Sequence, residues 1–344
     1  MRYLFYTIAL VVLAQPAWAV KATPEAPIEL AGTTGSFDFI EVDVAQRRLL
    51  ACHTGNNSLD VVDVDTGKLI KSIPTGSAQG VAMDAKNGRY YVSVSRPAKL
   101  VIIDAARLEV IGEVALPNSP DLLAYHEGTN RVFVCNDEKP ELWVIDPEAK
   151  SIVKTIALPG SGLEDLGFDA AGNFLFQNIK DTSEIARIDV SKLEVIDLWP
   201  TAPSEKPHGL AVIPVKGDLL IAGANGKFTY RHPQSGRLVE IAEIAPKSDQ
   251  IAFDAGLSVA YCASGSGVIS VVAVKDDLVT PQPAIPSTQG AHSLAVDAQT
   301  HAVWIAYATG PKSFVQKFSI APDAPTPTPT PKPKPSASPK PVAK

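Results

Sequence analysis

Residues 80–124 read GVAMDAKNGRYYVSVSRPAKLVIIDAARLEVIGEVALPNSPDLLA, and this stretch decides the fold. Three short runs rich in β-branched and aromatic residues (VAM, YYVSV and LVIID) are separated by turn residues, and a fourth (VIGEVAL) leads back to the opening pattern. Runs of this length bounded by turn residues are typical of β-strands. The stretch therefore predicts one antiparallel unit of four strands.

The same unit recurs along the chain. The end of its third strand is expected at seven positions that lie 41 to 45 residues apart: Asp63, Asp104, Asp146, Asp189, His232, Ala273 and Phe318. A period of about 40–45 residues with four strands per unit is typical of propeller blades. The sequence thus predicts an all-β, seven-bladed β-propeller of four-stranded antiparallel blades, in which neighbouring sheets bury each other.

The last repeat indicates how the ring closes. Its strands are expected at residues 293–296, 303–306 and 315–320, and no fourth strand follows them. An apolar run at residues 27–30 (PIEL) precedes the first repeat. We expect this N-terminal strand to complete the last blade and so to remove an open sheet edge.

The first 19 residues have the pattern of a signal peptide. Arg2 is followed by an apolar run at residues 3–14 and by an A-x-A cleavage pattern (AWA) at residues 17–19. We expect cleavage after Ala19 and a periplasmic or secreted protein; a retained anchor is the alternative. The run is shorter than the about 20 residues of a membrane span, so no transmembrane segment is expected in the mature form.

Residues 323–344 form a Pro/Lys-rich tail outside the propeller of residues 20–322. Proline at nearly every second position predicts extended polyproline II without a core of its own. Four lysines against Asp323 give the tail a net charge of +3. The whole chain has a net charge of −6 and the signal peptide contributes +1 through Arg2, so residues 20–322 have a net charge of −10. An acidic disc is a poor platform for nucleic acid. The tail is either a spacer or a contact to an anionic envelope polymer, and we expect a monomer.

The three cysteines occupy one column of the repeat. Cys52, Cys135 and Cys262 fall at the same position of the second strand in blades one, three and six. These blades are not adjacent, so their Cα atoms should lie beyond the about 7 Å that a disulfide can span. We expect buried packing thiols, with a disulfide or redox role as the alternative.

A second column carries polar side chains. Two residues before the apolar pair of each first strand stand, in order, Asp38, Gln79, Asp121, Glu164, His208, Asp249 and His292. We call these seven residues the mouth ring, because the innermost strands of a propeller begin around the mouth of its central channel. Converging polar groups in a concavity are candidates for a ligand-binding site.

Three interpretations of the mouth ring remain open. Asp and His at strand starts can simply bond free backbone N–H groups near a turn. Alternatively, the ring holds a divalent cation: carboxylates would suit Ca²⁺, whereas Glu164, His208, Asp249 and His292, which share one arc, would suit Zn²⁺. Finally, crowded carboxylates can raise one another's pKa and supply acid–base chemistry.

Loops after the second strands are expected on the same face. They add two further candidate ligand-binding residues, Asn136 and Asn178, and a set of basic side chains at Arg96, Lys139, Lys180, Lys227 and Lys312. His126 lies instead at the far end of a first strand, in the column of Asp43, Asp84, Asp169, Asp254 and Asp297. We interpret it as a turn residue on the opposite face.

Several catalytic motifs are missing from the sequence. It contains no C-x-x-C-H, no G-x-S-x-G, no H-E-x-x-H and no phosphate-binding glycine loop. This disfavours covalent haem and a serine hydrolase of the common type, and the catalytic residues of any enzyme remain unknown.

The chain resembles the YVTN-repeat (YncE-like) β-propellers of bacteria. The resemblance rests on RYYVSVSRPAKLVIIDAARLEV, RVFVCNDEKPELWVIDPEAKSIVKTIALPG, SEIARIDVSKLEVIDLWP and HGLAV, and covers residues 28–320. It implies an exported seven-bladed propeller that binds proteins, polymers or nucleic acid. Related quinoprotein and amine-dehydrogenase propellers point to periplasmic redox chemistry, but their cofactor residues are not matched. No literal Y-V-T-N tetrad is present, and blades five and six depart from the V-I-D pattern at residues 230–232 and Ala273.

The leading hypothesis is an exported binding or scaffold module that uses its channel-mouth face for a small molecule, a polymer or a protein. One alternative is a metal-dependent, lactonase-like hydrolase with its metal at the mouth. A second is a periplasmic redox-associated propeller, and a third is a structural envelope protein attached through its tail.

Overall fold

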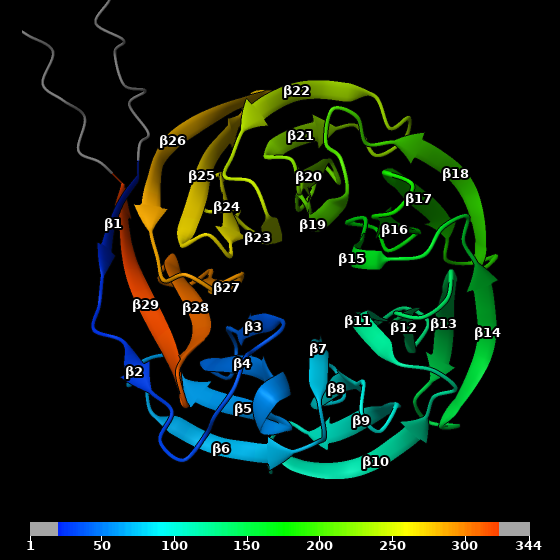
Figure 1. Ribbon diagram of the computed structural model, residues 1–344. Helices are drawn as coiled ribbons and strands as arrows, with labels where there is room; N and C mark the ends of the chain where they lie inside the picture. The colour runs from blue at the N-terminus through cyan, green and yellow to red at the C-terminus, as the bar shows by residue number, and fades with distance from the viewer. Residues whose placement is uncertain (1–19, 323–344) are drawn as a thin grey trace, which may run out of the picture.

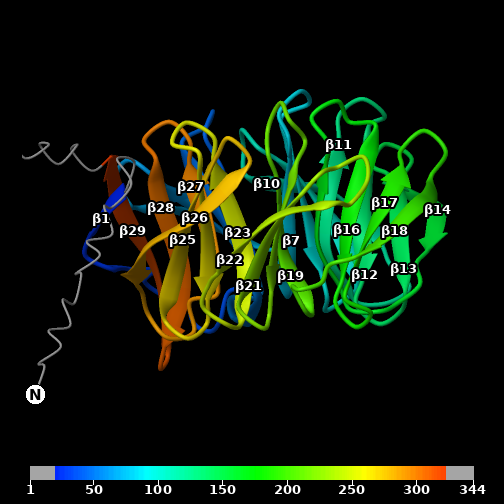
Figure 2. The same cartoon turned by 90° about the horizontal axis from the view of Figure 1, so that it is seen from above.

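The protein is a ring of seven antiparallel sheets around a central axis, seen face-on in Figure 1. The computed structural model describes residues 20–322, so the predicted signal peptide and Pro/Lys tail lie outside the described residues. Seen edge-on in Figure 2, the strands run between the two faces of a disc. Within residues 20–322, no helix is long and apolar enough to cross a membrane.

Each blade contributes one strand to each of four concentric layers. The innermost strands are β3 (Ile40–Asp43), β7 (Ala78–Asp84), β11 (Pro120–His126), β15 (Leu163–Phe168), β19 (Pro207–Val212), β23 (Ser248–Asp254) and β27 (Ser293–Asp297). The second layer holds β4 (Arg48–His53), β8 (Arg89–Val94), β12 (Arg131–Asn136), β16 (Phe174–Ile179), β20 (Leu219–Gly223), β24 (Val259–Ser264) and β28 (Ala302–Thr309).

The two outer layers follow the same order. The third strands are β5 (Ser58–Asp63), β9 (Lys99–Asp104), β13 (Glu141–Asp146), β17 (Glu184–Asp189), β21 (Lys227–Arg231), β25 (Val268–Lys275) and β29 (Lys312–Pro322). The rim is formed by β6 (Leu69–Pro74), β10 (Glu109–Ala115), β14 (Ser151–Ala157), β18 (Glu194–Pro200), β22 (Leu238–Glu243) and β26 (Leu278–Pro286). A single 3₁₀ turn, η1 (Thr54–Asn56), follows β4. The predicted seven-bladed fold is confirmed.

The core is divided among the interfaces between blades. One buried apolar cluster lies at each of the seven interfaces, from that between blades one and two to that between blades seven and one. Second strands are buried along nearly their whole length, whereas rim strands such as β18 alternate between exposed and half-buried residues. Each sheet is therefore stabilised mainly by its neighbours, as the repeat pattern requires.

The N-terminal segment closes the ring, but it does so in two pieces. Residues Ile28 and Glu29 form the short strand β2, which pairs with β29 opposite Val315 and Phe314. The longer piece is β1 (Val20–Pro24), which pairs with the far half of β29. The predicted run at 27–30 thus supplies only part of the closing strand. Its upstream part was missed because VKATP lies at an exposed edge and lacks an apolar run.

The cysteine prediction is confirmed. Cys52, Cys135 and Cys262 are free and fully buried in β4, β12 and β24. Burial raises the pKa of all three thiols. They act as small packing residues and do not form a disulfide with one another.

A candidate binding site at the channel mouth

A recurring irregularity in the inner strands brings polar side chains to the channel mouth. In blades two to six the pairing between first and second strands shifts register near the start of the inner strand, for example between Pro120 and Leu123 and between Leu163 and Leu166. A bulge adds an unpaired residue and redirects its side chain. The mouth-ring residues of these five blades lie within these shifts, whereas Asp38 and His292 come just before β3 and β27.

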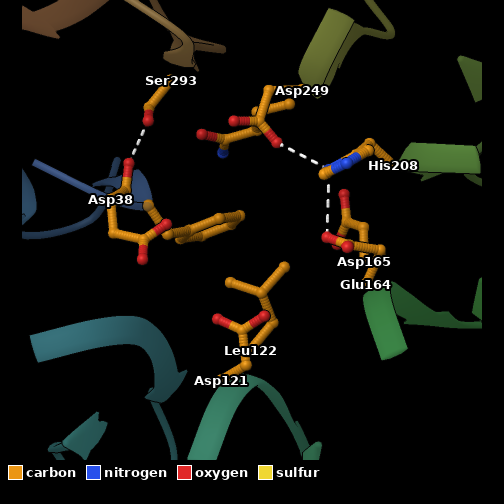
Figure 3. A pocket seen from close by; sticks show the side chains of 10 residues that line it. Asp38, Asp121, Leu122, Glu164, Asp165, His208, Asp249 and Ser293 are labelled. Carbon is orange, nitrogen blue, oxygen red and sulfur yellow. Dashed lines mark hydrogen bonds and ion pairs between the residues drawn. The ribbon is translucent and has the colours of Figure 1, made fainter. Parts of the chain in front are cut away.

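The mouth encloses a small cavity of about 40 Å³. Five mouth-ring residues line it: Asp38, Asp121, Glu164, His208 and Asp249 (Figure 3). In five blades the residue directly after the mouth-ring position also lines the cavity; these residues are Phe39, Leu122, Asp165, Gln250 and Ser293. This space accommodates a few water-sized groups, so it fits the head group of a ligand and not a large molecule.

One arc of the mouth is a continuous chain of ion pairs. The Nδ1 atom of His208 lies 3.0 Å from Glu164 Oε2 and 3.0 Å from Asp249 Oδ1. His292 Nδ1 lies 2.7 Å from the other oxygen of Asp249, and Lys180 pairs with Glu164 from the loop after β16. Figure 3 shows His208 between the two carboxylates. The predicted quartet of Glu164, His208, Asp249 and His292 is therefore assembled in space.

These contacts fix the charge of the arc. Burial alone would lower the pKa of His208, but its hydrogen bonds to Asp249 and Glu164 raise it to about 9. Burial alone would raise the pKa of Asp249, but the two histidines outweigh it and hold that pKa well below its usual range. The hydrogen bond to Asp249 also raises the pKa of His292. At neutral pH the arc therefore contains imidazolium–carboxylate pairs.

The opposite arc carries two carboxylates without such partners. The side chains of Asp38 and Asp121 form no hydrogen bond and no ion pair with any residue in 20–322. Asp38 is held through its backbone, whose N–H donates to the Cys52 carbonyl and whose carbonyl accepts from Ser293. Burial and the negative charge of Asp249 raise the pKa of Asp38 to about 7, and nearby His292 offsets this in part. Burial and the charge of Asp38 raise the pKa of Asp121 well above its usual value.

Below the mouth the channel widens into a second cavity of about 190 Å³. The two cavities share Phe39, Leu122 and Asp165, so they are adjacent along the axis. Most residues that line the lower cavity are apolar, but two are acids, Glu41 and Asp165, whose pKa burial raises to about 7 in each case. The channel thus combines a polar mouth with an apolar wall and further carboxyl groups below.

Three of the predicted site residues, Gln79, Asn136 and Asn178, have structural roles. Gln79 donates to Ser95 Oγ and to the Ser77 carbonyl within its own blade. Asn136 bonds Glu141 and the Glu138 N–H, also within its own blade. None of the three lines the mouth cavity.

Asn178 acts on the site from behind. It is fully buried, and its Nδ2 donates to the backbone carbonyls of His208 and Gly209 at 2.9 and 3.2 Å. It therefore positions the bulge that carries His208, while its own Oδ1 stays buried without a partner among the described residues.

The metal interpretation receives no geometric support. Within residues 20–322 no group of three or more His, Cys, Asp or Glu side chains is arranged to hold a metal ion. Both carboxylate oxygens of Glu164 and both of Asp249 already contact Lys180, His208 or His292. Metal binding requires the neutral imidazole, whereas these contacts raise the pKa of both histidines.

Sequence reasoning missed Asp165, Gln250 and Ser293 as lining residues of the mouth. Gln250 donates to the Ile40 carbonyl and accepts from the Leu294 N–H, so it joins blades six, seven and one beneath the mouth. Asp165 accepts from the backbone N–H of Leu210 in the next blade. Each follows a mouth-ring position, and this adjacency was the available signal.

Comparison with known proteins supports the fold alone. No protein family matches the chain by sequence, and none of the curated proteins does. Among solved structures, hydrazine synthase from Kuenenia stuttgartiensis is similar, with a TM-score of 0.70 and 12% sequence identity over 87% of this chain and 99% of that chain. At this identity the likeness shows that the chain is a β-propeller, in agreement with its seven sheets.

Proposed function

We propose that the protein is an exported β-propeller binding module of the YVTN-like type, whose channel mouth binds the cationic head group of a small organic molecule. The observation that carries this proposal is the pair of half-buried carboxyl groups of Asp38 and Asp121, which have no hydrogen-bond donor or ion-pair partner among residues 20–322. A cation placed between them would replace the protons that they hold and would lower the free energy of both carboxylates.

The rest of the channel favours an amine over an anion. Beneath the two acids lie apolar side chains, including Met83 and Leu123, which can pack against a short alkyl chain. Glu41 and Asp165 lie further down and could accept a second amino group. The histidines and Lys180 are already paired with Glu164 and Asp249, so an anionic ligand would have to break these contacts.

Export is part of the same proposal. The strands that close the ring, β1 and β2, lie after the expected cleavage site, so removing residues 1–19 leaves the described ring closed. N-terminal sequencing of the protein from a periplasmic fraction should find Val20 first. A chain that retains Met1 in the cytoplasm would contradict this part of the proposal.

Binding can be tested by calorimetric titration with butylammonium, 1,4-diaminobutane, Ca²⁺ and Zn²⁺. We expect at least one of the amines to bind, and to bind more tightly at pH 8 than at pH 5, because the carboxyl groups must lose their protons. The Asp38→Asn/Asp121→Asn double variant should lose affinity by about tenfold or more.

The control variant is Asp276→Asn, at an exposed carboxylate on the opposite face with a left-handed φ of 51° that asparagine tolerates. It should bind as the natural chain does. If the double variant binds amines unchanged, or if no amine binds, the proposal is wrong. Binding of Zn²⁺ or Ca²⁺ alone would instead favour the metal-dependent hydrolase.

A further inference from the structure

The face opposite the mouth contains a larger cleft between blades three and four, with a volume of about 730 Å³. We call it the interblade cleft. It is formed by the turn between β11 and β12, the turn between β15 and β16, and the end of β17. Its apolar wall is aromatic, with Tyr125, Phe168 and Phe174 half-buried along it.

The cleft lies where the repeat pattern is broken. At three other interfaces on this face the aspartate that ends an inner strand is bonded to the next blade: Tyr90 donates to Asp43, His301 lies 2.8 Å from Asp254, and Arg47 lies 2.8 Å from Asp297. Blade three has His126 in place of this aspartate. His126 is the last residue of β11 and not a turn residue as we expected, but its Nδ1 contacts the following turn, 2.8 Å from Thr129 Oγ1.

The His126 ring packs against blade four without a polar bond. Its ring centre lies 4.9 Å from that of Phe168, and a Cβ atom on Gly172 would lie 2.6 Å from its Nε2. No hydrogen bond or ion pair joins blades three and four on this face within residues 20–322, so the contacts between the blades there are apolar.

The charge of the cleft is negative. Its lining includes the carboxylates of Glu127, Asp169 and Asp189 and no lysine or arginine. Lys192 pairs with Asp189 at 3.2 Å, whereas Glu127 and Asp169 have no cationic partner within residues 20–322. The two neighbouring clefts on this face differ, because Lys216 lines both of them.

Aromatic side chains beside unpaired carboxylates form the kind of groove that receives proline-rich, basic segments, which lose little entropy on binding. The chain itself contains one such segment, residues 323–344, with proline at nearly every second position and a net charge of +3. We propose that the interblade cleft is the docking site for this chain's own C-terminal tail.

Topology and length allow this docking. The third strand of a blade ends on the face where its first strand ends, so β29 ends at Pro322 on the same face as the cleft. The 22 residues that follow would span about 68 Å as polyproline II. The disc is about 50 Å wide by the scaling of compact domains, so the lysine-bearing half of the tail reaches blades three and four.

Zero-length carbodiimide cross-linking of the full chain tests this contact, because the reagent joins a lysine amine to a carboxylate only where the two touch. We expect peptides that join Lys332, Lys334, Lys340 or Lys344 to Glu127 or Asp169. Cross-links spread evenly over exposed carboxylates such as Glu109, at the start of β10 on the same face, would overturn the proposal. When ¹⁵N-labelled and unlabelled chains are mixed in equal amounts, both peptides of each cross-link should carry the same label, because they come from one chain. Cross-links between a labelled and an unlabelled peptide would assign the cleft to the tail of a second copy.

Two matched substitutions provide the control. Ala171→Lys places a cation and added volume in the cleft, and Ala106→Lys makes the same change at an exposed turn of blade two on the same face. Ala171→Lys should lower the yield of the Glu127 cross-link by about fivefold, whereas Ala106→Lys should leave it unchanged. Equal yields in the two variants would overturn the proposal.

A second measurement guards against a misfolded variant. All seven blades and the closing strand lie within residues 20–322, so a chain that ends at Pro322 retains the complete ring. It should bind a fluorescent peptide of residues 323–344, more weakly in high salt, and with about fivefold lower affinity when it carries Ala171→Lys. No binding by this chain would also overturn the proposal. These outcomes do not depend on the channel mouth.

Discussion

His208 sets the electrostatics of the channel mouth through contacts made by a single atom. Its Nδ1 is shared between Glu164 and Asp249, which lie in the blades on either side of its own. One N–H can point at only one acceptor at a time, so the positive charge of the ring contributes to both contacts. The imidazolium therefore joins blades four, five and six at the mouth.

Replacing His208 with glutamine should remove stability in a pH-dependent way. The pKa of His208 is raised in the folded state, so its contribution is fully present below the unfolded value of 6.5 and is lost as pH rises through about 9. We expect His208→Gln to lower the free energy of unfolding by on the order of 2 kcal/mol at pH 6.5, and by much less at pH 9.5. Urea denaturation at both pH values measures this; an equal loss at both would contradict it.

Asp38 should have the opposite effect on stability. Its pKa is raised from 3.8 to about 7 in the folded state. The cost of ionising it in the folded protein is therefore absent below pH 3.8 and fully present above about pH 7. Asp38→Asn should therefore leave stability unchanged at pH 4 and increase it by on the order of 1–2 kcal/mol at pH 8. Thermal unfolding at the two pH values checks this, with Asp276→Asn as the control. A variant that is less stable at pH 8 would show that the Asp38 carboxylate has a partner.

At the scale of elements, the bulged inner strand explains which site residues could be predicted. The repeat register identified the mouth ring, because all blades share one backbone path. Strict alternation would place the next residue, such as Asp165 after Glu164, on the other side of the strand. The bulge breaks that alternation and turns both residues into the mouth. Sequence periodicity shows the repeat but not the bulge, so Leu122, Asp165 and Gln250, which lie in bulged strands, were missed as lining residues.

The closing strand is the element on which the ring depends. The β1 and β2 strands cover the edge of β29, and His53 supports the same junction from blade one, where its Nε2 lies 3.0 Å from Ser313 Oγ. Deleting residues 20–24 would expose the backbone groups of β29 that pair with β1. An exposed strand edge is both destabilising and prone to pair with other chains.

We therefore expect the chain lacking residues 20–24 to unfold at lower temperature, with a loss of about 2–4 kcal/mol, and to associate as its concentration rises. Thermal melts and size-exclusion chromatography measure the two effects. Removing residues 323–344 is the matched control, because that deletion leaves every described strand intact. A fully stable, monomeric chain without β1 would mean that β2 alone closes the ring.

At the scale of the whole molecule, the seven-fold repeat gives every blade the same path but not the same chemistry. The mouth differs from arc to arc: blades four to seven supply paired charges, and blades one and three supply Asp38 and Asp121 without partners. The fold followed from the period alone, because burial between sheets leaves few other arrangements. The function does not follow from the period, because it depends on these departures from symmetry.

The most direct measurement is the number of protons released when an amine binds at pH 7. An alkylammonium ion keeps its own proton at this pH, so any proton released comes from the protein. Potentiometric titration of the natural chain should show release of about one proton per ligand bound, and little or none from the Asp38→Asn/Asp121→Asn variant. Binding without proton release, or equal release from the double variant, would contradict a cation site at these two carboxyl groups.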